Sequence, residues 1–236
     1  MGVWLHVLLA GVFGGLVALE RRAFLQAMLS RPLVAATLTG MLLDDVPSGL
    51  FVGLILELFH LGSANLGAAL SDNETLAATG AAAAAAALAK GSGGGGTPAI
   101  WSLAILLFAG LGRLGRLLDR ALERYSGRLA LTAQASADAG DLTGAMRQNL
   151  WGMWPHFLVF GGCTAVCAAL GYLMAPDFER LPLAMVRGLA WAYPAMGGVA
   201  AAMAVRGSHA RQAPWLALGA AALVCAFAWA TRGGAT

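Results

Sequence analysis

The sequence predicts an all-α, polytopic membrane protein with about 6–8 transmembrane or re-entrant helical segments. Two observations lead to this fold class. First, 59% of the 236 residues are hydrophobic and only 11% are charged, whereas a soluble domain carries about 25% charged residues. Second, the apolar residues are gathered into runs that charged residues separate. We therefore treat residues 1–236 as a single integral membrane domain.

Some of the apolar runs are long enough to cross a bilayer, which takes about 20 residues, and others are too short. The long uncharged windows are residues 1–19, 91–112, 151–175, 188–205 and 212–231. The short runs are residues 32–43, 46–56, 58–71 and 75–89. Transporters build solute sites from broken segments of this kind. We therefore expect a broken-helix or re-entrant core over residues 31–90.

Small residues indicate where helices of the first half meet. Gly11 with Gly15, and Gly49 with Gly53, form G-x-x-x-G pairs, and such pairs favour close helix contact. The uninterrupted alanines at residues 81–87 are only weakly hydrophobic. We expect this alanine tract to pack against protein rather than lipid.

Basic residues predict the orientation, because Lys and Arg near helix ends favour the cytoplasmic side. They gather in three clusters, which are Arg21 with Arg22, the arginines from Arg113 to Arg128, and Arg206 with Arg211. If all three clusters are cytoplasmic, the N-terminus lies outside and residues 31–112 cross the membrane an even number of times. Two and four crossings both satisfy this condition, with the remaining short pieces re-entrant.

Residues 113–150 are predicted to form a cytoplasmic amphipathic segment. Arginines recur every three or four residues from Arg113 to Arg128, and leucines and alanines occupy the other side of the same helix. This pattern is typical of a basic helix lying on the inner leaflet. Its simplest role is a positive-inside anchor, and the alternative is a docking surface for a cytoplasmic partner. C-terminal transmembrane helices are expected over residues 151–231.

The sequence predicts no covalent chemistry by this chain. It contains neither a G-x-S-x-G motif nor a Walker loop. Cys163, Cys167 and Cys225 lie in apolar stretches without the further ligands that a zinc site needs. We expect no cofactor, no metal and no nucleic-acid partner, since the basic residues lie between apolar runs rather than in one patch.

Glu57 is the sharpest candidate for a solute contact, because it interrupts the apolar stretch SGLFVGLILELFHLG. An ionisable residue inside a membrane costs about 3 kcal/mol on insertion scales and usually faces a cavity or a partner. The alternative is a carboxylate at a helix end. His60 follows one helical turn later and could touch Glu57, and Asn65 offers both a donor and an acceptor to hydroxyl groups. Asp72 has two open interpretations, solute contact and capping of the next helix.

Three segments occur in an order and spacing that resemble a known family. They are RPLVAATLTG at residues 31–40, GLILELFHLG at 53–62 and NLGAALSDNETLAA at 65–78. Together with GLAWAYPAMGGVAAAMAV at 188–205, they resemble the IIC subunit of the mannose/fructose/sorbose-type sugar phosphotransferase system. The resemblance implies a non-catalytic translocation subunit of the bacterial plasma (inner) membrane, which moves a hexose-type sugar inward for phosphorylation by a cytoplasmic IIB component. It also implies a hetero-oligomer with a IID membrane subunit and cytoplasmic IIA and IIB partners.

By motif position, the resemblance places Glu57 and Asn65 beside the sugar path. The substrate-binding candidates are Glu57, Asn65, Asp72, His60 and Gln26. The family commonly has an acid, Gln and His ahead of Arg-Pro, and this chain has Gln26, Met28 and Ser30 at those positions. This departure keeps two other hypotheses open. One is a divergent, non-transporting membrane anchor that recruits phosphotransferase proteins through the arginine-rich helix, and the other is an unrelated small-solute transporter.

Overall fold

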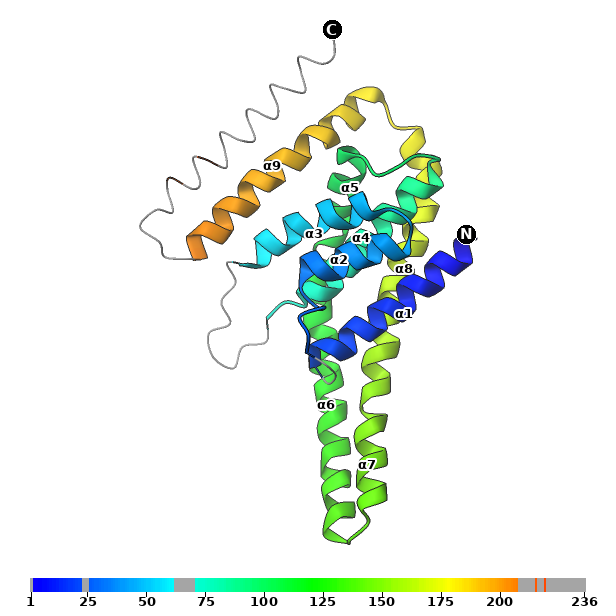
Figure 1. Ribbon diagram of the computed structural model, residues 1–236, viewed down its shortest axis with the longest axis vertical. Coiled ribbons are helices and arrows are strands. Elements are labelled where there is room, and N and C mark those ends of the chain that lie inside the picture. The colour runs from blue at the N-terminus through cyan, green and yellow to red at the C-terminus, as the bar shows by residue number, and fades with distance from the viewer. Residues whose placement is uncertain (1, 23–25, 62–70, 208–214, 216–218, 220–236) are drawn as a thin grey trace.

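The computed structural model describes residues 2–22, 26–61, 71–207, 215 and 219 (Figure 1). The elements formed by these residues are helices, as the sequence predicts. In chain order they are α1 (Val3–Arg22), α2 (Pro32–Leu42), α3 (Val46–Leu61), α4 (Glu74–Gly91), α5 (Pro98–Phe108), α6 (Leu111–Asp138), α7 (Leu142–Trp151), α8 (Met153–Glu179) and α9 (Leu183–Gly207).

Helix α4 lies at the centre of the bundle and contacts α1, α2, α3, α5, α6 and α8. Every residue from Thr75 to Ala89 is buried, including the alanine tract. The prediction that this tract packs against protein is therefore confirmed. A side chain added at Gly171 of α8 would collide with the backbone of Ala84. Small residues on both helices thus let α4 and α8 approach closely.

Both G-x-x-x-G pairs lie at helix contacts, as predicted. A side chain added at Gly11 of α1 would meet the backbone of Gly161 in α8. One added at Gly49 of α3 would meet Gly40 of α2. The glycines therefore set the spacing of the α1–α8 pair and of the α2–α3 hairpin.

Helices α2 to α5 alternate in direction along the bundle. The α2–α3 turn lies beside the start of α1 and the end of α4, where Asp44 is 3.7 Å from His6 and 3.3 Å from Lys90. At the other end of the hairpin, the start of α2 meets the end of α3 through Arg31 and Glu57. The described residues between α1 and α6 therefore make four helical passes, and the number of membrane crossings stays a prediction.

Two of these passes are short helices. Helices α2 and α5 have 11 residues each, or about 16 Å of helix. This length is roughly half of the hydrocarbon core of a bilayer. Helix α2 corresponds to a predicted short run, whereas α5 lies in the window 91–112 that was predicted to be long, and it reaches a spanning length only together with α6. The short helices therefore leave backbone ends and polar loops within reach of the bundle interior.

Helices α6 and α7 pair as a hairpin that extends beyond the other helices (Figure 1). Gly140, with φ of 82°, lies in the turn, and Asp141 caps α7 by accepting a 2.8 Å hydrogen bond from a backbone N–H of its first turn. The sequence predicts that the helix following Arg113 lies on the inner leaflet. In the structure its leucine side has a protein neighbour, since Leu129 packs against Gly152.

Four described helical stretches are long and apolar enough to cross a membrane. They are Val3–Arg22, Pro98–Asp138, Leu142–Glu179 and Leu183–Val205. Large apolar side chains such as Leu8 and Leu158 are more than half exposed on these helices, which suits contact with lipid. The chain is thus an all-α, polytopic membrane protein. Its orientation stays a prediction, and the window at residues 212–231 lies outside the described residues except for residues 215 and 219.

Candidate functional site

The candidate site is centred on Glu57, near the end of α3. Its carboxylate forms an ion pair with Arg31 and accepts a 3.2 Å hydrogen bond from the backbone N–H of Leu33. Leu33 lies in the first turn of α2, whose N–H groups have no partner within the helix. Glu57 therefore caps a neighbouring helix from across the bundle, where the positive end of the α2 dipole also favours a carboxylate.

The two partners of this ion pair differ in exposure. The side chain of Glu57 is 12% exposed, whereas that of Arg31 is 52% exposed. The carboxylate is thus fixed inside the protein, and the guanidinium group reaches it from the accessible side. Arg31 belongs to the motif that carried the family resemblance, but the sequence did not show that Glu57 was its partner.

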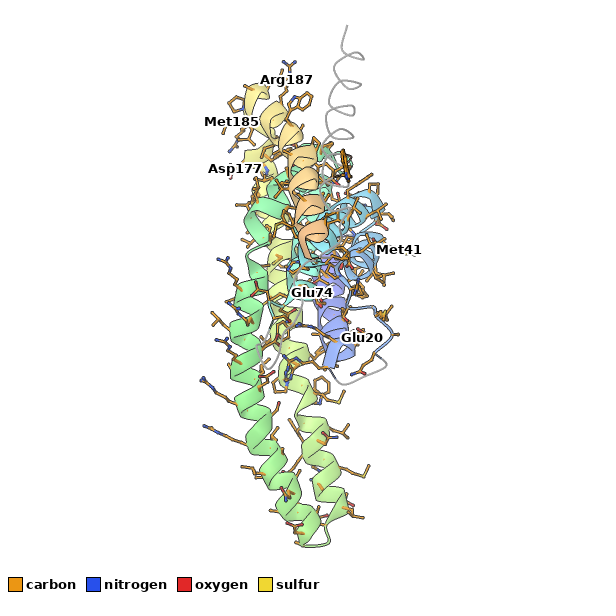
Figure 2. All side chains as sticks on the ribbon, turned by 90° about the vertical axis from the view of Figure 1, so that its left-hand side faces the viewer. Glu20, Met41, Glu74, Asp177, Met185 and Arg187 are labelled. Atoms are coloured by element: carbon orange, nitrogen blue, oxygen red, sulfur yellow. The ribbon has the colours of Figure 1, made fainter. Side chains whose placement is uncertain are left out.

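A second carboxylate, Glu20 at the end of α1, holds the segment before α2. It is 4% exposed and accepts hydrogen bonds from the backbone N–H groups of Ser30 (2.9 Å) and Leu29 (3.3 Å). Thr75 in the first turn of α4 donates a 2.8 Å hydrogen bond to the carbonyl of Ser30. Figure 2 shows Glu20 near one end of α1 and Glu74 at the start of α4. Helices α1 and α4 therefore position the residues that lead into Arg31.

Gln26 and His60 have no contact with Glu57 among those that the structure describes. Gln26 is exposed and has φ of 47°, so it lies in a non-helical stretch ahead of α2. His60 is half-buried, and its Nδ1 donates a 2.7 Å hydrogen bond to the carbonyl of Leu56 in its own helix. The candidate Asn65 lies outside the described residues.

Asp72 lies at the start of α4 and is 3.3 Å from the Nε of Arg116 in α6. The cap of α4 is its neighbour Asn73, whose Oδ1 accepts a 2.9 Å hydrogen bond from the N–H of Leu76. The residue that caps α4 is therefore Asn73 and not Asp72. Asp72 instead ties the start of α4 to α6.

A buried carboxylate that the sequence analysis missed lies next to this cap. Asp119 of α6 is 1% exposed and is 3.3 Å from Arg21 and 3.1 Å from Arg22. Asn73 Nδ2 donates a 3.0 Å hydrogen bond to it. A usable signal existed, because Asp119 lies on the same helix face as Gly112 and Gly115, which are buried. Two of the predicted arginine clusters therefore meet where α6 leaves the helical bundle.

The comparisons with known proteins identify the family. Residues 4–229 match the family of sorbose-specific IIC components of the phosphotransferase system. This match covers nearly the whole chain. The chain belongs to the sorbose-specific IIC family.

Curated relatives of this IIC-family chain match over a short stretch. The mannose-specific EIIC component of Escherichia coli K12 is 44% identical over 48 residues, and the sorbose-specific EIIC component of Klebsiella pneumoniae is 46% identical over 48 residues. Each match covers 20% of this chain and 18% of the relative. The chain therefore aligns with less than a fifth of the length of these relatives.

Solved structures share the fold of the IIC-family chain along most of its length. A structure described as a membrane protein covers 98% of this chain and 92% of its own, with a TM-score of 0.64 and 23% identity. The mannose transporter ManYZ, solved in complex with microcin E492, covers 97% of this chain and 94% of its own, with a TM-score of 0.55 and 21% identity. At these identities the likeness concerns the fold.

The chemistry of the Glu57 site suits a neutral ligand with several hydroxyl groups. The carboxylate of Glu57 accepts hydrogen bonds, and the guanidinium group of Arg31 offers five N–H donors in a planar fork. Within the described ranges, no group of three His, Cys, Asp or Glu side chains is placed to hold a metal ion. The site thus pairs strong donors with a strong acceptor around a helix start.

Proposed function

We propose that this chain is the sugar-translocating membrane subunit of a phosphotransferase system. In this function it moves a hexose-type sugar inward, and a cytoplasmic IIB partner phosphorylates the sugar as it reaches the inner face. The family match over residues 4–229 supports this proposal, and so do the names of the mannose- and sorbose-specific relatives. The chain itself would contribute no catalytic group.

The observation that carries the proposal is the ion pair between Glu57 and Arg31. The guanidinium group of Arg31 is half exposed, so water can solvate it when it leaves Glu57. The largely buried carboxylate then needs other hydrogen-bond donors, which the hydroxyl groups of a sugar supply. Hydroxyl groups of a sugar would then bind to Glu57 and Arg31 through charge-assisted hydrogen bonds, which are stronger than neutral ones. The hydrogen bond from Leu33 keeps the carboxylate in place during this exchange.

The remaining candidates complete the proposed sugar path on sequence grounds. Asn65 would contact the sugar together with Glu57. Gln26 and His60 would line the approach, and Asp72 would act at the start of α4, where Arg116 positions it. Movement of this core against the other helices would expose the site to each side in turn, as in other transporters with broken helices.

The proposed assembly contains a IID membrane subunit and the cytoplasmic IIA and IIB components, in a bacterial plasma membrane with the N-terminus outside. The arginine-rich start of α6 would then face the cytoplasm together with the end of α1. The fold likeness to the ManYZ transporter supports a partner within the membrane. Helix α9 has room for such a partner, since only 6% of its apolar window is buried within the described residues.

Sugar uptake measured with the Glu57→Gln variant tests the proposed translocation function. The chain is reconstituted into vesicles with its IID partner, and IIA and IIB are supplied on the inner side. Glutamine keeps the size of the side chain and an acceptor for the Leu33 N–H, so the fold should persist. A hydrogen bond to a charged group contributes about 1.5–3 kcal/mol, so uptake should fall about 10- to 100-fold. Asn65→Ala should also abolish uptake.

The matched control is Glu179→Gln, which changes an exposed glutamate at the end of α8. It should leave uptake unchanged. Normal uptake by both Glu57→Gln and Asn65→Ala would refute the site. If the unmodified chain supports no uptake with any hexose but still retains IIA and IIB at the membrane, the non-transporting anchor is the correct function.

A further inference from the structure

A cavity of about 480 Å³ lies where the α6–α7 hairpin joins the bundle. It is enclosed by the end of α1, the middle of α6, the end of α7 and the start of α8. Its polar lining consists of Arg22, Glu123, Ser126, Gln148, Asn149 and His156. None of these residues belongs to the Glu57 site.

Two side chains that line the cavity carry buried polar atoms without a hydrogen-bond partner among the described residues. These atoms are Nε2 of His156 and Oε1 of Gln148. His156 is 8% exposed. A buried polar atom without a partner costs about 1–3 kcal/mol, so these two atoms favour binding of a molecule that forms hydrogen bonds with them.

Both of these unpaired atoms are acceptors. Nδ1 of His156 lies 3.3 Å from the carbonyl oxygen of Gly152 and can only donate to it, which leaves Nε2 of the neutral ring as an acceptor. Nε2 of Gln148 donates to the hydroxyl of Ser136 at 3.4 Å, which leaves Oε1 as the acceptor. The cavity therefore needs a ligand that donates hydrogen bonds.

The charges of the lining exclude an anion from this role. Arg22 is the cation of the cavity, but Glu123 lies 2.9 Å from it and Asp119 lies 3.1 Å from it. Because Asp119 also pairs with Arg21, the two arginines and the two carboxylates balance before any ligand arrives. A phosphate group offers acceptors to a lining that already has unpaired acceptors. A neutral molecule with several hydroxyl groups offers the donors instead, and Leu129 and Met153 provide apolar walls for its C–H faces.

We propose that this cavity binds a neutral polyhydroxyl compound of hexose size, at a site separate from Glu57. The hydroxyl groups donate to Gln148 Oε1, to His156 Nε2 and to the carboxylate of Glu123, and the side-chain amide of Asn149 completes the contacts. The proposal rests on the proposed function only for the choice of hexoses as the first probes. Binding here does not require transport.

Protection of an engineered cysteine tests the site directly. Ala133 lines the cavity, and Ala137 is exposed one turn later on the same helix. Each is changed to cysteine in a full-length chain whose three native cysteines are replaced by alanine. Mannose, sorbose and mannitol should each slow alkylation of Ala133→Cys and leave that of Ala137→Cys unchanged. Inorganic phosphate at the same concentration should protect neither.

Variants of the lining then assign the contacts. Gln148→Leu and His156→Phe each remove one acceptor, so the concentration of sugar that protects Ala133→Cys should rise about 3- to 10-fold. Gln134→Leu, an exposed glutamine on α6, is the control and should not change it. Gln148→Leu should fold normally, because it removes an unpaired Oε1 and one 3.4 Å hydrogen bond to Ser136, whose hydroxyl still donates to the carbonyl of Thr132.

The same assay separates this proposal from the proposed function. Protection of Ala133→Cys that persists in Glu57→Gln supports a second, independent site, whatever the uptake result. Loss of protection in Glu57→Gln would show that there is no separate site and would overturn the proposal. Protection by none of the three polyols, equal protection by phosphate, or protection that Gln148→Leu does not weaken would also overturn it.

Discussion

Replacing Asp119 by alanine tests how the α6–α7 hairpin is fixed to the bundle. This carboxylate is 1% exposed and is contacted by Arg21 and Arg22 from α1 and by Asn73 at the start of α4. Its loss removes an acceptor shared by three helices. Glu123→Ala is the matched control, because Glu123 lies one turn later on α6 and pairs with the same Arg22, but is 41% exposed.

The expected cost of Asp119→Ala follows from the exposure of its partners. Removing one partner of a buried ion pair costs about 3–5 kcal/mol. Here the side chains of Arg21 and Arg22 are 21% and 28% exposed, so water can solvate both guanidinium groups after the change and lowers the cost. Asn73 is 3% exposed and would keep an unpaired donor at about 1–3 kcal/mol. We expect a net loss of about 2–3 kcal/mol.

Glu123→Ala should cost less than about 1 kcal/mol, as exposed ion pairs do. Alanine gains more helix propensity over Asp than over Glu, which favours Asp119→Ala, so a larger loss for Asp119→Ala reflects its burial. The measurement is unfolding of the purified chain in detergent, followed by circular dichroism over a denaturant series. Equal losses for the two variants, or no loss for Asp119→Ala, would refute the reasoning that this buried carboxylate fixes the hairpin.

Two further predictions concern packing and pH. Gly171→Val should destabilise the chain by about 1–3 kcal/mol, because the added side chain overpacks the α4–α8 contact. Gly162→Val on the same helix should be neutral, because the space around Gly162 is open. Thermal unfolding in detergent compares the two variants, and equal effects would contradict the close contact. The hydrogen bond and charge of Lys90 hold the pKa of Asp44, in the α2–α3 turn, below its ordinary value. The contact therefore stabilises the fold above about pH 4 and is lost as the pH falls through the lowered pKa. Lys90→Met should lower the unfolding temperature at neutral pH but not at the acidic end of a pH series, and an equal loss throughout would count against the contact.

The helices and their close contacts were predictable because their signals are local. The short runs at residues 32–43 and 75–89 correspond to α2 and α4. The predicted break at Glu57 is wrong, because α3 continues through this residue to Leu61. The G-x-x-x-G pairs and the alanine tract predict helix contacts for a steric reason that needs no knowledge of the partner. What could not be predicted was which helix each small face would meet.

The polar partners were not predictable because they are distant in sequence. Arg21 and Asp119 are separated by 98 positions, and the ion pair depends on how α1 and α6 are placed by the whole bundle. Glu57 was predicted as a candidate from its apolar surroundings, but its pairing with Arg31 depends on the turn between α2 and α3. Glu20 followed a long apolar helix and resembled an ordinary interfacial acid. Only the fold shows that it caps the residues before α2.

Two carboxylate–arginine contacts of the same chemistry join helices of this bundle, and burial separates their roles. Asp119 is almost fully buried and has several partners, so removing any one of them leaves others in place and the helices stay together. Among the described residues, Glu57 has one charged partner, Arg31, whose side chain is half exposed, and water already competes for that guanidinium group. An incoming hydroxyl can replace the solvated guanidinium group beside Glu57, but it cannot enter the Asp119 cluster without separating α1, α4 and α6. The Glu57 contact is therefore suited to exchange with a ligand, and the Asp119 cluster is suited to holding α1, α4 and α6 together.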